Sequence, residues 1–249
     1  MCQFFSFTTK GSKRYYFNWE QRQDLLRDNP NDYNPDSHSS INAYFGLDDD
    51  KVNKYEYNPL TGEFSVDQIN IKDDRALAKE WVEKLDFKTV VEPLIIKPIV
   101  HPFKLPKVES VSSENVERLR QWASVGALVV DSVGASVVDS VGASVVDSVW
   151  ASVVDLVWAS VRYSVRDSAR DSVWNSISDS ALAYTSSFFD MKEWEYIDHN
   201  EGENPFQSCI DLWEEGIVPS FDGKMWRLHS GENADVIFEI SKEELLPEH

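Results

Sequence analysis

The chain has 249 residues, 42% of them hydrophobic, and carries a net charge of −19. The apolar content excludes a disordered chain, and the charge excludes bulk attraction to nucleic acid or to anionic membranes. No uncharged apolar run approaches the ~20 residues of a spanning helix. We see no signal peptide at the N-terminus, and two cysteines form no disulfide framework. The composition predicts a soluble, cytoplasmic protein with no membrane partner.

Residues 1–90 predict a small α+β domain. Turn residues between apolar runs, including a Pro-Leu-Thr-Gly sequence before Gly62, are typical of hairpins. The face of the second helix should consist of Leu77, Trp81, Val82 and Leu85. The expected elements are a hairpin around Gly11, a helix over 19–27, a hairpin over 52–71 and a helix over 73–85.

Residues 91–122 predict a connector. Four prolines occur between Val91 and Lys107, and proline neither donates to a ladder nor continues a helix. Ser112 or Ser113 should then cap a short helix that ends at Trp122.

Residues 123–182 are fifteen four-residue repeats. The second position is Ser in thirteen repeats, which indicates a need for a small hydrogen-bonding side chain. The third position is Val in twelve, so we predict that it is buried. The fourth varies from Gly to Trp, a range of volumes that no packed column tolerates, so it should face outward. The first position, mostly Ala or Asp, should also face water.

The repeat length favours a β-solenoid over a helix. Val, Ser, Asp and Gly are mediocre or poor helix formers. A stripe repeating every four residues drifts by about 40° per repeat on an α-helix and leaves no fixed buried face. A β-solenoid stacks identical positions directly. Coils of twelve residues, favoured over sixteen, would stack Trp150, Arg162 and Trp174. A helical repeat region is the alternative.

This block resembles the short-period β-solenoids, of which pentapeptide-repeat proteins are the best known. It differs in its period of four and in having Val inside. That family includes acidic members that imitate duplex DNA and inhibit DNA-binding enzymes, so the resemblance implies a phage-type inhibitor or DNA mimic as one role. The flanks, at residues 54–62 and 216–223, resemble proteins of unassigned function from phages and gut bacteria.

Residues 183–249 predict a small α+β cap. A helix is expected over 206–215, because Gly216 and Pro219 follow it. Strands are expected over 225–229 and 236–240, and the acidic end after Ser241 should be frayed.

Three segments carry weak chemical signals. Cys2 would become an N-terminal nucleophile if Met1 were removed, as in amidotransferase-type hydrolases, but a half-buried structural role is favoured. His38 follows Asp36, which could orient the imidazole as a general base, although turn formation is favoured there. The acidic run 48–50 lacks a calcium-loop pattern. No catalytic residue, metal or cofactor is therefore predicted.

The sequence as a whole predicts a non-enzymatic acidic repeat scaffold that binds a protein partner. The partner would be basic or a DNA-binding protein, and nucleic acid itself would not bind. An N-terminal-Cys hydrolase with the solenoid as an appendage is the alternative. The predicted binding residues lie on the outer positions of the repeats and are Asp131, Asp139, Asp147, Asp155, Trp150, Trp158, Trp174 and Arg162.

Overall fold

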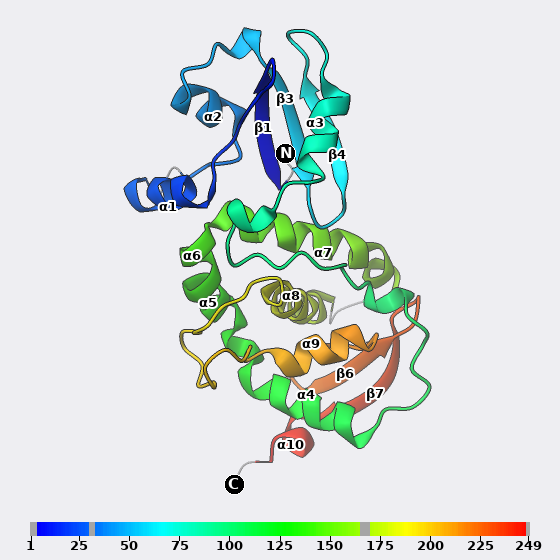
Figure 1. Ribbon diagram of the computed structural model, residues 1–249. Coiled ribbons are helices and arrows are strands. Elements are labelled where there is room, and N and C mark those ends of the chain that lie inside the picture. Colours follow the sequence, from blue (N-terminus) through cyan, green and yellow to red (C-terminus); the bar gives the residue numbers. More distant parts are fainter. Residues whose placement is uncertain (1–3, 30–32, 165–169, 248–249) are drawn as a thin grey trace. The chain divides into compact units, whose positions relative to one another are not determined.

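The computed structural model describes residues 4–29, 33–164 and 170–247, without the side chains of 155–174. The chain forms two units (Figure 1). Unit 1 comprises Met1–Pro98 and Val141–Val149, and unit 2 comprises Ile99–Ser140 and Trp150–His249. The repeats contribute to both units.

Unit 1 contains an antiparallel sheet of four strands in the order β2-β1-β3-β4. The two expected hairpins are confirmed, because β1 pairs with β2 and β3 pairs with β4. The central pair is β1 with β3, which places Phe7 opposite Tyr55. The strands are β1 (Phe5–Lys10), β2 (Lys13–Tyr15), β3 (Asn53–Asn58) and β4 (Glu63–Gln68).

The helices of unit 1 match the predictions from the sequence less closely than the strands do. The expected helices are confirmed as α1 (Trp19–Asp28) and α3 (Arg75–Val82), whereas α2 (His38–Tyr44) was not predicted. The predicted face of α3 is wrong at Leu77, which is 61% exposed. The helix is shorter than expected; it buries Val82, as predicted, and Ala78 in place of Leu77.

A buried ion pair holds the loop before α2 against α1. Arg22, 1% exposed, donates from both terminal nitrogens to the two carboxylate oxygens of Asp36, at 3.0 and 2.6 Å. Its Nε donates to the carbonyl of Phe17. This bidentate geometry satisfies both charges, as a buried pair requires.

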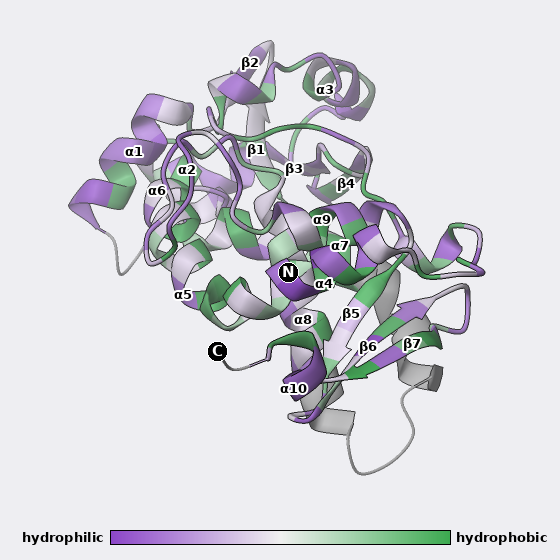
Figure 2. Ribbon diagram, turned by 90° about the horizontal axis from the view of Figure 1, so that it is seen from below, coloured by the Kyte–Doolittle hydropathy of each residue, from purple (hydrophilic) through white to green (hydrophobic). Residues whose placement is uncertain are grey.

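Unit 2 packs helices against an antiparallel three-stranded sheet in the order β5-β6-β7. Strand β6 is largely buried, whereas no residue of β7 is fully buried; hydrophobic and hydrophilic residues are mixed along both strands (Figure 2). The expected helices and strands are confirmed, whereas β5 was not predicted. The acidic end is not frayed as expected, because a capping box starts α10. The elements are α4 (Ser113–Val125), α9 (Gln207–Glu214), β5 (Val218–Phe221), β6 (Met225–Ser230), β7 (Asp235–Ser241) and α10 (Lys242–Leu245).

The predicted β-solenoid is wrong. The described part of the repeat block is helical and contains no strand, which corresponds to the helical alternative. The predicted stacking of Trp150, Arg162 and Trp174 in coils of twelve is wrong for the same reason, since residues twelve apart lie about 18 Å apart along an α-helix. The repeat helices are α5 (Val129–Val133), α6 (Asp139–Val141), α7 (Ala143–Ser164) and α8 (Arg170–Ser186).

A π-helix explains in part how a four-residue period keeps one face buried. A 3-10 turn at Gly126–Leu128 precedes α5, and a π-helix at Gly134–Val138 follows it. The i→i+5 turn of a π-helix holds more residues than an α turn and absorbs part of the drift. The inward assignment of the third position is confirmed at seven successive valines, each at most 2% exposed: Val129, Val133, Val137, Val141, Val145, Val149 and Val153.

The prediction that the first and fourth positions of the repeat face outward is confirmed only in part. Asp131, Asp139 and Asp147, at the first position, are exposed. The fourth position is not uniformly outward, because Gly142 and Val146 are buried. A helix that drifts brings this neighbouring position partly onto the buried side.

Several serines at the second position donate to the backbone of their own helix. The hydroxyl of Ser140 donates to the carbonyl of Ser136 at 2.7 Å, and Ser148 donates in the same way to Ser144. Ser180 repeats the pattern with Ser176 at 3.0 Å. Because every residue of a helix offers a backbone carbonyl, these bonds need no partner outside the helix, although the hydroxyls of Ser132 and Ser144 are buried without a partner among the described residues.

The stretch Ser113–Val141 is long and apolar enough to cross a membrane by length and composition alone. Here it comprises α4, α5, α6 and the turns between them, so it is not one continuous α-helix. Val129, Val133 and Val137 are buried in unit 2. Core helices of soluble proteins meet the same test, and this burial is consistent with a soluble protein.

Candidate functional site

The predicted binding residues do not form one established surface. Asp131 and Asp139 are exposed on unit 2, whereas Asp147 is exposed on unit 1. Trp150 is half-buried. The side chains of Asp155, Trp158, Arg162 and Trp174 lie outside the described residues. Of the predicted binding residues, only Asp131 and Asp139 are therefore shown to be exposed on the same unit.

Unit 2 carries most of the negative charge. Its acidic residues outnumber the basic ones by more than two to one, whereas the excess in unit 1 is small. Part of this excess lies in the segment 190–203, between α8 and α9. The exposed acidic residues of the segment are Asp190, Glu193, Glu195, Asp198, Glu201 and Glu203.

Tyr196 is the exposed aromatic residue of this acidic segment. Its side chain is 65% exposed, and its backbone φ is 67°. A left-handed conformation is uncommon for a bulky residue and costs of order 1–3 kcal/mol, so it persists only where neighbouring contacts hold it. Strain of this kind gathers at functional sites, and exposed tyrosines are enriched in binding hot spots.

The contacts that hold Tyr196 are on both sides of it. Trp194, 5% exposed, packs edge-on against Phe206 with ring centres 5.7 Å apart. The amide of Trp194 donates to Nε2 of His199 at 3.1 Å, and the amide of Glu195 donates to Oγ of Ser136 at 2.8 Å. Ser136 lies in the π-helix between Asp131 and Asp139. The segment is thereby attached to the repeat stretch that carries those two aspartates.

We call Asp131, Asp139, Glu193, Glu195, Tyr196 and Asp198 the acidic surface. The sequence gives a signal for it that was missed, namely acidic residues alternating with aromatic ones just after the repeats. Its attachment to Ser136 joins positions 59 residues apart, and no local pattern predicts such a contact.

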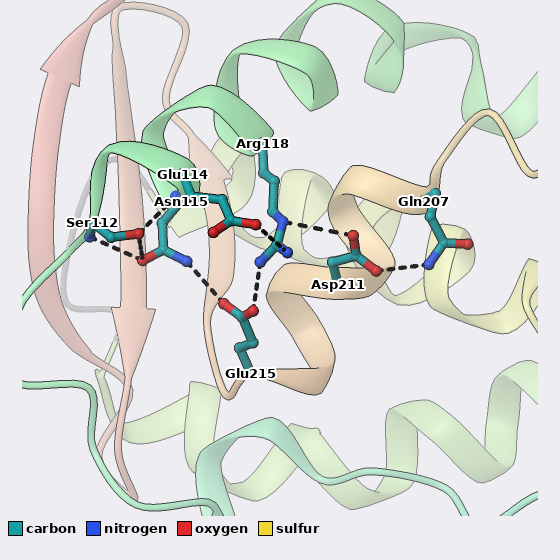
Figure 3. A network of polar contacts seen from close by, with 7 residues as sticks. All are labelled: Ser112, Glu114, Asn115, Arg118, Gln207, Asp211 and Glu215. Atoms are coloured by element: carbon teal, nitrogen blue, oxygen red, sulfur yellow. Dashed lines mark hydrogen bonds and ion pairs between the residues drawn. The ribbon is translucent and has the colours of Figure 1, made fainter.

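A second polar cluster joins α4 to α9 (Figure 3). Arg118 contacts the carboxylates of Glu114, Asp211 and Glu215 at 2.9, 3.6 and 2.5 Å. Asn115 donates to Glu215 at 2.8 Å. The carboxylates raise the pKa of Arg118, with Glu215 contributing most. Because one cation faces three carboxylates, the junction of α4 and α9 also carries a net negative charge. The contacts of Arg118 fix α4 against α9, one turn before Trp122.

The candidate chemistry at His38 is not supported by its contacts. Asp36 is committed to Arg22, so it does not orient the imidazole. The ring nitrogens of His38 lie 3.1 Å from the carbonyl of Tyr55 and 3.3 Å from the carboxylate of Asp67. Both nitrogens are thus engaged in structural contacts. Cys2 lies outside the described residues.

The other reactive or ligating groups are placed as follows. Cys209 is buried, and burial raises the pKa of its thiol, so it is not a ready nucleophile. Within the described residues, Asp48–Asp50 and the other acidic residues form no group placed to hold a metal ion.

A serine–histidine pair that was not predicted lies between β5 and β6. Oγ of Ser220 is 2.7 Å from Nε2 of His229, and Nδ1 of His229 is 3.0 Å from the carbonyl of Ala234. The carbonyl can only accept, so Nδ1 carries the proton and Nε2 accepts from the serine. Ser220 is 0% and His229 5% exposed. The geometry resembles a nucleophile and its base, but no substrate reaches it, and we interpret the pair as structural.

This pair predicts a dependence of stability on pH. Burial lowers the pKa of His229 below its ordinary value of 6.5. The unfolded chain therefore binds a proton there more readily, and unit 2 should lose stability as pH falls below about 6.5. A His229→Gln variant should be less stable at pH 8 but should lose less between pH 7 and 5. Denaturant titrations at each pH measure the difference, and parallel curves for the two proteins would contradict it.

No family model, curated protein or solved structure matches the chain. The functional argument therefore depends on the residues and geometry described above.

Proposed function

We propose that the chain is a non-enzymatic, cytoplasmic binding protein whose acidic surface recognises a basic region of a protein partner. The observation that carries this proposal is Tyr196, held exposed in a left-handed conformation among uncompensated carboxylates. An aromatic anchor within a charged surface is a common arrangement in protein interfaces. The pentapeptide-repeat resemblance pointed to a DNA-binding enzyme as the partner, but it rested on a β-solenoid, and the helical repeats remove that support.

The charges and the tyrosine should contribute differently. Carboxylates at the rim of an interface mainly accelerate encounter and lose influence as salt rises, since the screening length at 0.15 M is about 8 Å. A central aromatic residue mainly slows dissociation, and its loss often costs 2 kcal/mol or more. Salt dependence and residence time therefore report separately on the two parts of the acidic surface.

Partner capture from a lysate of the native host tests the proposal. Neutralising Asp131, Asp139, Glu193 and Asp198 with Asn or Gln should reduce capture several-fold and flatten its salt dependence. Tyr196→Ala should reduce capture about ten-fold or more but leave the salt dependence in place. Both variants should keep the melting temperature, because the replaced side chains are exposed.

The matched control neutralises the same number of exposed acids of unit 1, with Glu20→Gln, Asp50→Asn, Glu63→Gln and Glu92→Gln. Capture should remain within a factor of two. If this control lost capture equally, net charge rather than the acidic surface would be responsible. Unchanged capture by both unit 2 variants would refute the site. Identification of the partner then decides whether it binds DNA.

A further inference from the structure

A cavity of about 480 Å³ lies within unit 2, apart from the acidic surface. Its size falls within the range of small-molecule sites. Its walls come from the end of α4 and the first repeats, from α8, from the turn between β5 and β6, and from α10. The lining residues used below are Trp122, Gly126, Asp179, Phe221, Trp226 and Lys242.

Asp179 is the polar group of this cavity that lacks a countercharge. Within the described residues, no hydrogen bond or ion pair connects the carboxylate of Asp179 to another group. Burial raises the pKa of Asp179, because the charged form is poorly solvated there. The buried carboxylate of Asp36 is compensated by Arg22, whereas Asp179 is half-buried. An uncompensated, desolvated carboxylate destabilises the fold, and a bound cation would remove that cost.

Aromatic rings form much of the remaining wall. Phe221 stacks on Trp226 with ring centres 4.6 Å apart and an interplanar angle of 20°. Trp122 is 1% exposed, and its indole N–H is buried without an acceptor among the described residues, so Trp122 serves here as an apolar wall. Rings of this kind attract organic cations through their negative faces.

Trp122 is held in place from two directions. A Cβ atom on Gly126 would lie 3.0 Å from its ring, so the glycine of the first repeat gives the ring its room. One turn earlier, the Arg118 cluster fixes α4 against α9 (Figure 3). The cavity is therefore bounded by side chains that independent contacts hold rigid.

The charge of the surroundings favours a cation over an anion. Unit 2 carries a large acidic excess, which concentrates cations near it. The positive group of the lining, Lys242, is exposed. Its ammonium group can therefore remain in water at the entrance.

We propose that this cavity binds a small organic ammonium ion, with Asp179 as the countercharge and the rings of Trp122, Phe221 and Trp226 around its apolar part. No bond is made or broken, and the site is a binding site. It is independent of the acidic surface, since the two use different residues.

Calorimetric titration of the full chain in 0.15 M KCl tests the proposal with two pairs of probes. Choline is compared with its neutral isostere 3,3-dimethylbutan-1-ol, and benzylamine with benzyl alcohol. At least one cation should bind saturably, and about ten-fold more tightly than its neutral counterpart, because the interaction with a charged partner is lost. Because potassium is present throughout, unselective binding of simple cations does not contribute to the measured affinity.

Asp179→Asn should weaken the binding of the cation about ten-fold or more and should leave the neutral probe unchanged. It should also keep or raise the melting temperature, since an unpaired desolvated charge is removed. Phe221→Leu should cost about two- to five-fold through the lost ring. Glu232→Gln is the control, at an exposed acidic residue of unit 2 outside both the cavity and the acidic surface, with the same charge change, and should bind like the wild type.

Three results would overturn the proposal. They are no saturable binding of either cation at millimolar concentration, equal affinity for a cation and its neutral counterpart, and an equal loss in Glu232→Gln and Asp179→Asn. Partner capture by Asp179→Asn should be normal, which separates this site from the acidic surface.

Discussion

Replacing Val141 with aspartate should lower the free energy of unfolding of unit 1 by about 4 kcal/mol, whereas Val138→Asp should cost unit 2 less than about 1 kcal/mol. Val141 is fully buried at the third position of its repeat, so an aspartate there places an unpaired carboxylate in the core. Val138 is half-buried at the fourth position of the preceding repeat, and its replacement can reach water.

Denaturant titration followed by tryptophan fluorescence measures both variants. Val141→Ala serves as the control for lost volume and should cost about 2 kcal/mol, less than the aspartate. If Val141→Asp and Val138→Asp shifted the midpoint equally, the assignment of an inner and an outer position to the repeat would be wrong.

Two glycines of identical repeats should respond to alanine in opposite directions. Gly142→Ala should destabilise unit 1 by about 2–4 kcal/mol. Gly142 has φ of 88°, and a Cβ atom there would lie 2.1 Å from the ring of Tyr33. Gly134 lies in the π-helix with φ of −55° and has open space around its Cβ position, so Gly134→Ala should stabilise the chain by about 0.5–1 kcal/mol.

A second substitution separates the cost of the collision with Tyr33 from the cost of the left-handed backbone at Gly142. Tyr33→Ser together with Gly142→Ala removes the collision but keeps the left-handed backbone, so part of the loss should return. Chemical denaturation of the two single variants and of the double variant gives each contribution. Stabilisation by Gly142→Ala would show that the helix break at this glycine is not a fixed feature of the fold.

These glycines also show why local sequence could not predict the repeat structure. Residues 131–138 and 139–146 have the same sequence, DSVGASVV. The first copy continues as α5 and a π-helix, whereas the second breaks at Gly142. The difference lies outside the repeat, in Tyr33, which packs at Gly142 and donates to the carbonyl of Val141 at 3.3 Å.

The flanking hairpins and capped helices could be predicted because their signals are local. Ser112 accepts from the amide of Asn115 and starts α4, as a cap should. The buried third position was also predictable, because repetition marks it whatever the secondary structure. The solenoid was inferred from weak helix propensity, which tertiary packing overrode. The cavity could not be inferred, since Trp122, Asp179 and Trp226 come together only in the folded unit.

The serine bonds have a consequence for how many repeats the chain can hold. Because a serine hydroxyl can donate to the backbone carbonyl four residues earlier in its own helix, an added DSVGASVV unit needs no new partner elsewhere in the protein. Yet eight residues lengthen an α-helix by about 12 Å and turn everything beyond them by about 80°. Variation in copy number is thus limited by rotation rather than by hydrogen bonding. Only those lengths that return the next valine to the core should give a folded protein.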